Sequence, residues 1–419
     1  MPNQFSEVTD AELRDAESQI RAAGYTVETV GRIQLARILG PGMDRRAQTI
    51  LSKLRPKEKK QASPILERKL QIESQQLKKR LRDTLSTQVL NQKYQDFIAE
   101  VAEAPRHTPE WVHVPKSGRP KQGMPVLHLS DAHFDEVVDP KQVNWLNCYN
   151  RKIATARLKR FFEKSITLCD EYLKGVNYPG VVLAVSGDMF SGQIHEELKE
   201  TNEDALCGSF AYWIDPMYAG IRMLAERFGR VHVVSVTGNH PRLSIKPRAK
   251  GGVRDNFDWL LATMLQRDFR RDGDARVSFT VSEAFDLSFR IYQTRYLQTH
   301  GDQFKGGSGI AAELSPMMIG DARKRERQQA ANDPYDVMIA GHWHRRINME
   351  RFKMNGTLKG VDEYAFRSNF KYQRPQQSLW IDTPEHGITI EAPVFVKAEN
   401  EGWERTKTAD ARAVFEVAA

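Results

Sequence analysis

Five short loops of this 419-residue chain carry acidic, amide or imidazole side chains directly after a predicted strand. Each strand is a short apolar run, and in α/β sheets ligands bind beyond the carboxyl ends of such strands. Glycines flank several of the polar residues, which lets the backbone turn sharply and approach a bound ion closely. The loops have the sequences Asp131-Ala132-His133, Gly187-Asp188, Gly238-Asn239-His240, His300-Gly301-Asp302 and Gly341-His342-Trp343-His344.

Together these loops predict a site for two divalent cations. Carboxylate, amide and imidazole ligands without thiolate suit Mn, Fe or Zn. Two such cations roughly 3.5–4 Å apart can activate a water molecule and clamp a phosphoryl group. A single Asp-x-His or Gly-Asp sequence is usually an ordinary turn, but five such loops in this order favour one shared site. The chemistry that they indicate is hydrolysis of a phosphoester.

The five loops resemble the signature blocks of the calcineurin-like metallophosphoesterases, and the resemblance covers about residues 124–345. It implies an α/β (α+β sandwich) fold of two facing mixed β-sheets flanked by helices. It also implies that a hydroxide bridging the two metals attacks phosphorus in line, while His240 contacts the phosphate and protonates the leaving oxygen. The implied metal ligands are Asp131, His133 and His344 for the first ion, Asn239, His300 and His342 for the second, and Asp188 as the bridge.

The sequence departs from this family at two positions near His240. Members usually carry an acidic residue directly after the Gly-Asn-His block, where it can orient the histidine, but this chain has Pro241. Some branches also carry a second acid shortly after the Gly-Asp block, and none follows Asp188 closely here. We therefore expect another group to orient His240, or a weaker role for it in protonation.

The elements that must position these loops alternate between apolar runs and helical segments after residue 123. Helices are predicted over 151–174 and 209–228, and alternating residues over 378–397 predict further strands. The charged run 323–327 is interpreted as a solvent-exposed helix face. Strands before the five loops are predicted at residues 126–129, 181–185, 231–236, 296–299 and 337–340.

Residues 1–60 are expected to form a small helical domain. Helices are predicted over 9–23, where Thr9 and Glu12 form a capping box, over 27–39, and from about Asp44. This arrangement is compatible with a helix-turn-helix, and equally with a helical cap or docking domain.

Residues 61–104 are predicted to be one long basic amphipathic helix. Its leucine stripe could mediate a homodimer through residues 63–102, or pack on its own catalytic domain. A breaker-rich linker is expected at 105–123, a metallophosphoesterase domain at 124–400 and a C-terminal tail at 401–419.

The net charge of +8 lies mainly in the N-terminal region, where residues 1–122 hold 22 Lys and Arg against 15 Asp and Glu. Such a surplus attracts nucleic acid, although a solvated basic helix would show the same pattern. In the loop after His240, Arg242, Lys246 and Arg248 are candidate contacts to flanking phosphates. Residues 306–309 are interpreted either as a mobile lid or as an ordinary solvent-exposed loop.

These features favour a dinuclear-metal nuclease or phosphodiesterase acting on DNA, with Mn as the expected metal and Fe or Zn as alternatives. Residues 355–357, 360–364 and 373–380 resemble phosphoesterases of phages and prophages, which favours a gene similar to the DNA-repair nuclease branch. One alternative is a phosphomonoesterase, or a nucleotide or protein phosphatase, whose N-terminal region only mediates docking. Another is a non-enzymatic DNA-binding or scaffolding protein on a degenerate phosphoesterase.

The sequence offers no feature of a secreted or membrane protein. No run approaches the ~18 apolar residues of a membrane-spanning helix, and the N-terminus lacks a secretory signal. The three cysteines, Cys148, Cys169 and Cys207, have no metal-binding or disulfide spacing. We therefore expect no membrane partner and a cytoplasmic location.

Overall fold

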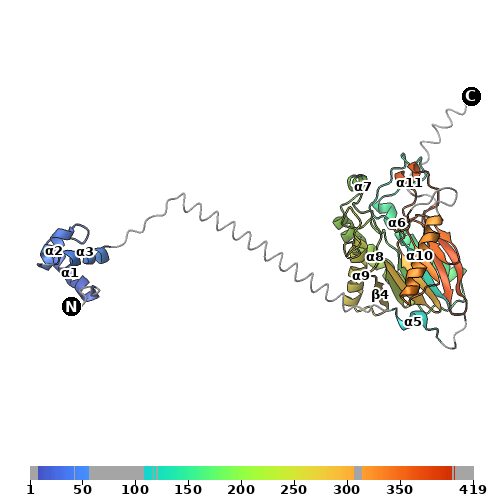
Figure 1. Ribbon diagram of the computed structural model, residues 1–419, viewed down its shortest axis with the longest axis horizontal. Coiled ribbons are helices and arrows are strands. Elements are labelled where there is room, and N and C mark those ends of the chain that lie inside the picture. The colour runs from blue at the N-terminus through green and yellow to red at the C-terminus, as the bar shows by residue number, and fades with distance from the viewer. Residues whose placement is uncertain are drawn as a thin grey trace, which may run out of the picture. The chain divides into compact units, whose positions relative to one another are not determined.

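A computed structural model describes residues 8–41, 43–55, 108–116, 118, 121–305, 314–398 and 401. The chain divides into two compact units, residues 1–96 and 97–419, drawn in Figure 1. The predicted long helix over 61–104, the proposed lid at 306–309 and the tail beyond residue 401 lie outside the described residues.

The first unit contains three helices, α1 (Asp10–Ala22), α2 (Arg32–Leu39) and α3 (Asp44–Leu54). The predicted capping box is present, because Thr9 and Glu12 each bind the backbone N–H of the other. The second helix begins at Arg32 rather than at residue 27, since the Thr26 and Thr29 hydroxyls close a turn before it. The helices share one apolar core formed by Val8, Ala16, Ile20, Val30, Leu35, Ala36, Ala47, Ile50 and Leu51.

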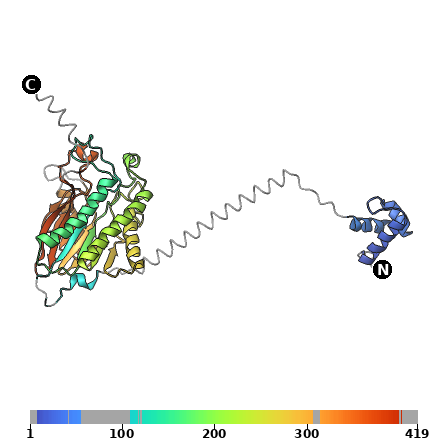
Figure 2. The same ribbon diagram turned by 180° about the vertical axis from the view of Figure 1, so that it is seen from behind.

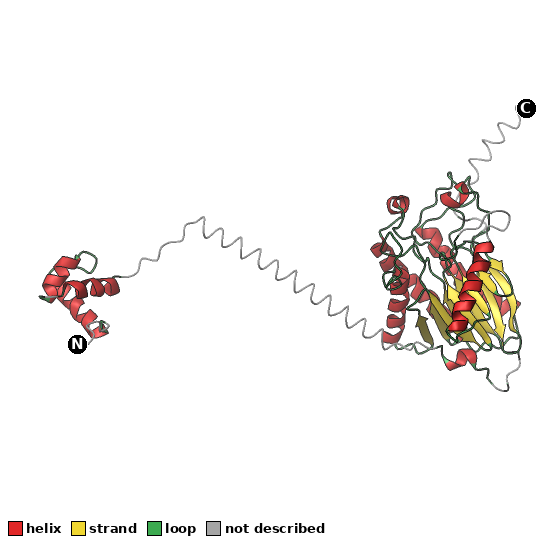
Figure 3. Cartoon of the chain, viewed as in Figure 1, coloured by secondary structure: helices red, strands yellow, loops and turns green. Residues whose placement is uncertain are grey.

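The second unit contains two mixed β-sheets, which confirms the predicted α/β architecture (Figure 3). The strand order of the first sheet is β11-β10-β1-β2-β3-β4, and that of the second is β5-β6-β7-β9-β8. The strands are β1 (Met124–Leu129), β2 (Val181–Val185), β3 (Val231–Ser235), β4 (Val277–Val281), β5 (Asp286–Ile291), β6 (Thr294–Thr299), β7 (Val337–Ala340), β8 (Ile347–Asn348), β9 (Phe352–Met354), β10 (Gln376–Thr383) and β11 (Gly387–Phe395).

Helices cover the outer face of each sheet. In Figure 2 α6 and α8 cross the first sheet, and in Figure 1 α10 lies over the second. The sequence indicated α6 and α8, and it did not indicate α9, β4 or β5. The helices of this unit are α5 (Glu110–His113), α6 (Arg151–Thr167) with its π-helical extension η1 (Leu168–Tyr172), α7 (Glu196–Thr201), α8 (Leu206–Phe228), α9 (Phe257–Arg271), α10 (Ser315–Ala330) and α11 (Glu363–Arg367).

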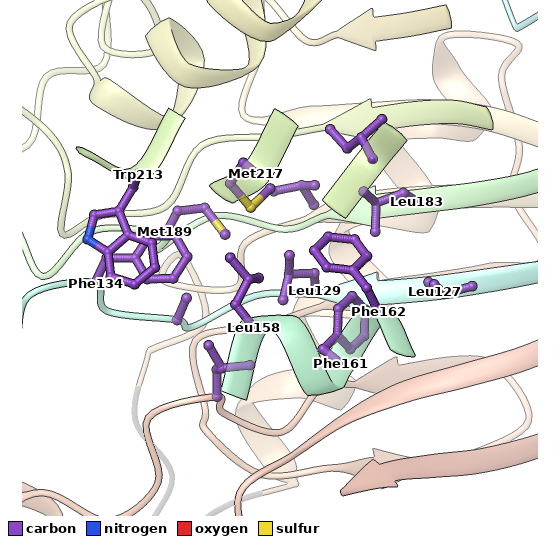
Figure 4. Close-up of a cluster of buried hydrophobic side chains, with 14 of the residues drawn as sticks. Leu127, Leu129, Phe134, Leu158, Phe161, Phe162, Leu183, Met189, Trp213 and Met217 are labelled. Atoms are coloured by element: carbon purple, nitrogen blue, oxygen red, sulfur yellow. The ribbon is translucent and has the colours of Figure 1, made fainter. Parts of the chain in front are cut away.

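The central strands β1, β2 and β3 of the first sheet are buried on both faces because each face packs against another layer. Leu127 and Leu129 of β1 pack beneath α6 and α8, in the cluster of buried side chains shown in Figure 4. Val126 faces the other way and packs against Tyr296 and Ile339 of the second sheet. Two apolar layers therefore hold the strands in fixed positions, and with them the carboxyl ends from which the loops begin.

Two sequence interpretations need correction in this unit. Part of the predicted linker at 105–123 forms α5, and Val112 of that helix is fully buried against the sheets. The run 323–327 is not uniformly solvent-exposed, because Lys324 of α10 is 4% exposed and pairs with Asp286 at 2.6 Å. Among the described residues, no helix is both long and apolar enough to cross a membrane.

Candidate metal centre

The five predicted loops meet where strands of both sheets end. Three of them follow β1, β2 and β3 of the first sheet, and two follow β6 and β7 of the second, so they do not lie on successive strands of one sheet. Five of their non-glycine residues adopt the left-handed backbone region, which such residues rarely occupy and which concentrates at functional sites. Their φ angles are 51° for Asp131, 46° for His133, 52° for Asp188, 69° for His342 and 52° for His344.

Two glycines of these loops lie against the carboxylates of Asp188 and Asp131. A Cβ atom at Gly238 would lie 2.1 Å from Oδ1 of Asp188, and one at Gly341 would lie 2.5 Å from Oδ2 of Asp131. Real Cβ contacts are never this short. Any side chain at either position would therefore displace the carboxylate beside it.

One group of ligand atoms forms around Asp188, His300 and His342, whose donor atoms all lie within 4.8 Å of one another. Nδ1 of His300 donates to the carbonyl of Ser186 at 2.7 Å, which leaves the lone pair of its Nε2 facing the centre. That Nε2 lies 3.0 Å from Oδ2 of Asp188 and 3.1 Å from Oδ1 of Asn239. Three electron-rich atoms converge here, so either a proton on His300 or a cation must offset their repulsion.

A second group contains Asp131, His133 and His344, again with donor atoms within 4.8 Å of one another. Nε2 of His133 and Nε2 of His344 are 3.0 Å apart, and the latter lies 3.5 Å from Oδ1 of Asp131. Nδ1 of His133 lies 3.3 Å from the buried carboxylate of Glu136, which pairs with Lys359 at 2.7 Å. A carboxylate behind a histidine is a usual support for a metal-binding imidazole.

Asp188 connects the two groups. It shares one ligand group with His300 and His342, and another with His133 and His240. Its Oδ1 accepts the backbone N–H of His240 at 2.8 Å, while its buried Oδ2 accepts no backbone N–H and faces Nε2 of His300 at 3.0 Å. A buried carboxylate oxygen that faces an imidazole nitrogen and no backbone donor is suited to a cation.

Burial and neighbouring charges set the protonation of this cluster. Burial lowers the pKa of His133 well below its usual value and that of His342 to about 3, so both imidazoles are neutral, the form that binds metals. Burial opposes charge on His300 as well, but Asp188 outweighs it and raises the pKa of His300 to about 10. Burial likewise opposes ionisation of Asp188, but His300 and His240 lower its pKa. The chain thus fits divalent cations in residue type and spacing, and a cation bound at Asp188 would replace the proton that His300 otherwise carries.

Asp258 of α9 is a positioning residue that the sequence analysis missed. Its buried carboxylate accepts the backbone N–H groups of Asp188 and Gly238, each at 2.9 Å, and that of Met189 at 3.1 Å. Burial and the nearby Asp188 raise its pKa to about 7. In the sequence it is an ordinary acid in the first turn of a helix behind the N-cap Asn256, so no local signal indicates its role.

The loop after β9 holds Asp131 in place. Thr357 donates its hydroxyl to the carbonyl of Asp131 at 2.9 Å, and Asn355 donates to the hydroxyl of Ser130 at 3.0 Å. Ser130 in turn donates to Oδ2 of Asp131 at 2.6 Å. Residues 355–357 stand out in the sequence only by their resemblance to phage phosphoesterases, whereas in the structure they support a candidate ligand.

The three candidate substrate contacts after His240 differ in their surroundings. The guanidinium of Arg242 donates to the backbone carbonyls of Asn239, Ser244 and Ile245 at 2.9–3.0 Å, so it folds its own loop. Arg248 is exposed and lies 3.4 Å from Asp255. Lys246 is exposed to solvent.

Comparison with known proteins gives distant structural likenesses. No family model matches the chain, and no curated protein is similar to it. Similar solved structures include Vps29 from Cryptosporidium parvum (12% identity, 65% of this chain, 97% of that chain, TM-score 0.26) and wild-type Vps29 with Zn²⁺ from Entamoeba histolytica (12%, 65%, 99%, 0.24). Another is the sulfate thiohydrolase SoxB from Thermus thermophilus in complex with glycerol (12%, 72%, 61%, 0.27).

Proposed function

We propose that this protein is a metal-dependent phosphoesterase. The observation that carries the proposal is the placement of Asp188 between two ligand groups, with one oxygen buried and facing Nε2 of His300 at 3.0 Å. Asp131, His133 and His344 would hold one ion, Asn239, His300 and His342 the other, and Asp188 both. Two divalent ions would supply Lewis acidity and an activated water at this point.

In this proposal His240 serves the substrate rather than an ion. Its Nδ1 donates to the backbone carbonyl of Ser191 at 2.9 Å, so Nε2 is the atom left to contact a phosphoryl oxygen or to deliver a proton. Burial lowers its pKa, although Asp188 partly opposes this effect. From its doubly protonated form, which the charge of Asp188 favours, His240 can act as a general acid through Nε2.

We further propose DNA as the substrate, cleaved as a phosphodiester with Mn²⁺, by an enzyme of a phage or prophage related to the DNA-repair nucleases. The support is the excess of 7 positive charges in residues 1–122, which contain 22 Lys and Arg but only 15 Asp and Glu. Positive charge in this region would attract a polyanion. Exposed Lys246 and Arg248 would add contacts to phosphates near the centre.

A substrate panel with Mn²⁺ tests both proposals. The full chain should bind two metal ions and hydrolyse bis(4-nitrophenyl) phosphate and labelled DNA. His240→Ala should keep both metals while turnover falls about 10²–10⁴-fold. If the chain bound metal but hydrolysed no ester, the proposed phosphoesterase activity would be rejected. Rapid hydrolysis of monoesters alone, unchanged after deletion of residues 1–107, would favour a phosphatase with a docking region.

A further inference from the structure

Residues 364–374, which we name the aromatic–basic segment, expose an unusual set of side chains. The segment reads Tyr-Ala-Phe-Arg-Ser-Asn-Phe-Lys-Tyr-Gln-Arg and contains no acid. Large exposed aromatic groups gathered in one place usually mark an interaction surface. The exposed aromatic residues are Tyr364 (65%), Phe366 (41%), Phe370 (56%) and Tyr372 (52%).

The segment is held in a defined conformation. Asp362 caps α11 by accepting the N–H of Ala365 at 2.7 Å. The rings of Tyr364 and Phe370 meet edge to face with centroids 5.7 Å apart. Near the other end, Gln373 accepts the backbone N–H of Arg346 at 2.6 Å. A binding surface that is already ordered loses less entropy when a ligand binds.

A cavity joins the aromatic–basic segment to the metal centre. Its volume is about 100 Å³, several times the roughly 30 Å³ that a water molecule occupies. Phe370 and Lys371 line it together with the candidate ligand His344 and its neighbour Trp343. The cavity thus offers aromatic contacts to a flat apolar group.

We propose that the aromatic–basic segment binds single-stranded nucleic acid and guides it to the metal centre, with one unpaired base in the cavity. The inference rests on the proposed phosphoesterase function and names its substrate class. Aromatic rings stack on the faces of bases, and interleaved cations contact the phosphates between them. A duplex hides the base faces, so only an unpaired strand can use these rings. The basic side chains and the continuity with His344 favour this ligand over an apolar protein surface.

Binding without cleavage tests the inference. Anisotropy of a labelled oligothymidylate is measured with the full chain in EDTA and 200 mM salt, which weakens general attraction to phosphates. In Tyr364→Ala/Phe370→Ala the dissociation constant should rise about 10-fold or more, since each stacked base contributes on that order. Tyr172→Ala, which removes a ring that is 74% exposed on η1, should bind like the wild type.

Two comparisons separate this inference from the proposed function. A blunt duplex of equal length should bind equally to the wild type and the double variant, and both should bind the same number of metal ions per chain. An unchanged dissociation constant for the single strand, or an equal loss for the duplex, would overturn the inference. Absent hydrolysis by the wild type would instead remove the proposed function, whatever the binding result.

Discussion

The backbone carbonyl of Ser191 lies 2.9 Å from Nδ1 of His240. A carbonyl can only accept, so Nδ1 carries a hydrogen and the ring is oriented without an acidic partner. This contact answers the question raised by Pro241, which stands where the family usually has an acid. The loop that carries Ser191 must approach closely, since a Cβ atom on Gly192 would lie 1.9 Å from the carbonyl oxygen of His240. The backbone carbonyl of Ser191 therefore orients His240, a role that an acidic side chain has in the proteins that this sequence resembles.

Asn202→Ala should reduce kcat through this loop. Asn202 accepts the Ser191 hydroxyl at 2.9 Å and donates to the carbonyl of Gly192 at 2.9 Å. Loss of hydrogen bonds worth about 1 kcal/mol each should lower kcat about 5- to 10-fold or more, with KM and metal content nearly unchanged. Lys199→Ala on the adjacent α7 is the matched control. A parallel fall in bound metal would show that Asn202 supports the fold rather than His240.

Asp188→Asn should empty both metal sites together. The amide keeps the size of the side chain but loses the negative charge that faces both ligand groups. Elemental analysis after dialysis should find two ions per wild-type chain and fewer than one per variant chain. Asp255→Asn, which alters a carboxylate beside exposed Arg248, should keep two ions. One full equivalent of metal retained by Asp188→Asn would contradict the bridging role.

The sequence was sufficient to predict the strands and loops that form the centre. The run Val181–Val185 is apolar on both faces and is followed, after Ser186, by Gly187 and Asp188, a pattern that identifies a buried strand and its loop. Their convergence follows because the carboxyl ends of β1, β2 and β3 lie on one edge of a parallel arrangement. Local sequence therefore defined the residues of the candidate site.

The supporting residues could not be predicted because their roles depend on distant partners. Lys324 belongs to a charged run typical of a solvated helix, and only the fold shows Asp286 of β5 beside it. Asp258 reaches Asp188 across 70 positions, and Ser191 acts on His240 through its backbone, which leaves no trace in residue type. Predictions from local patterns fail where a contact is non-local or uses main-chain atoms.

Asp382 should make stability fall as pH rises from about 4 to 7. Burial between the sheets raises its pKa from 3.8 to about 7, more than donation from Tyr296 and Thr294 lowers it. Between these pH values Asp382 keeps its proton in the folded protein but loses it in the unfolded chain. The stabilisation is therefore complete below the pKa of the unfolded chain and disappears as the pH rises to the pKa of the folded protein. The effect is at most about 4 kcal/mol.

Asp382→Asn removes this titration while an amide oxygen can still accept from Tyr296. Urea unfolding of both proteins in EDTA at several pH values measures the effect, because the shared contributions of other groups cancel in the difference. The wild type should lose stability relative to the variant between pH 4 and 7. A difference that does not change with pH would mean that Asp382 titrates normally.

Glu401→Ala should destabilise the second unit strongly. The side chains of Glu401 and Arg157 are 4% and 0% exposed and pair at 2.9 Å, and Arg160 binds the other carboxylate oxygen at 2.6 Å. Arg157 also donates to the carbonyl of Leu358, next to the threonine that holds Asp131. Without Glu401 the buried guanidinium lacks a counter-charge, which costs about 3–5 kcal/mol. Urea unfolding should show this loss, with a smaller one for Glu401→Gln and none for exposed Glu385→Ala; a loss below about 0.5 kcal/mol for Glu401→Ala would disprove the pairing.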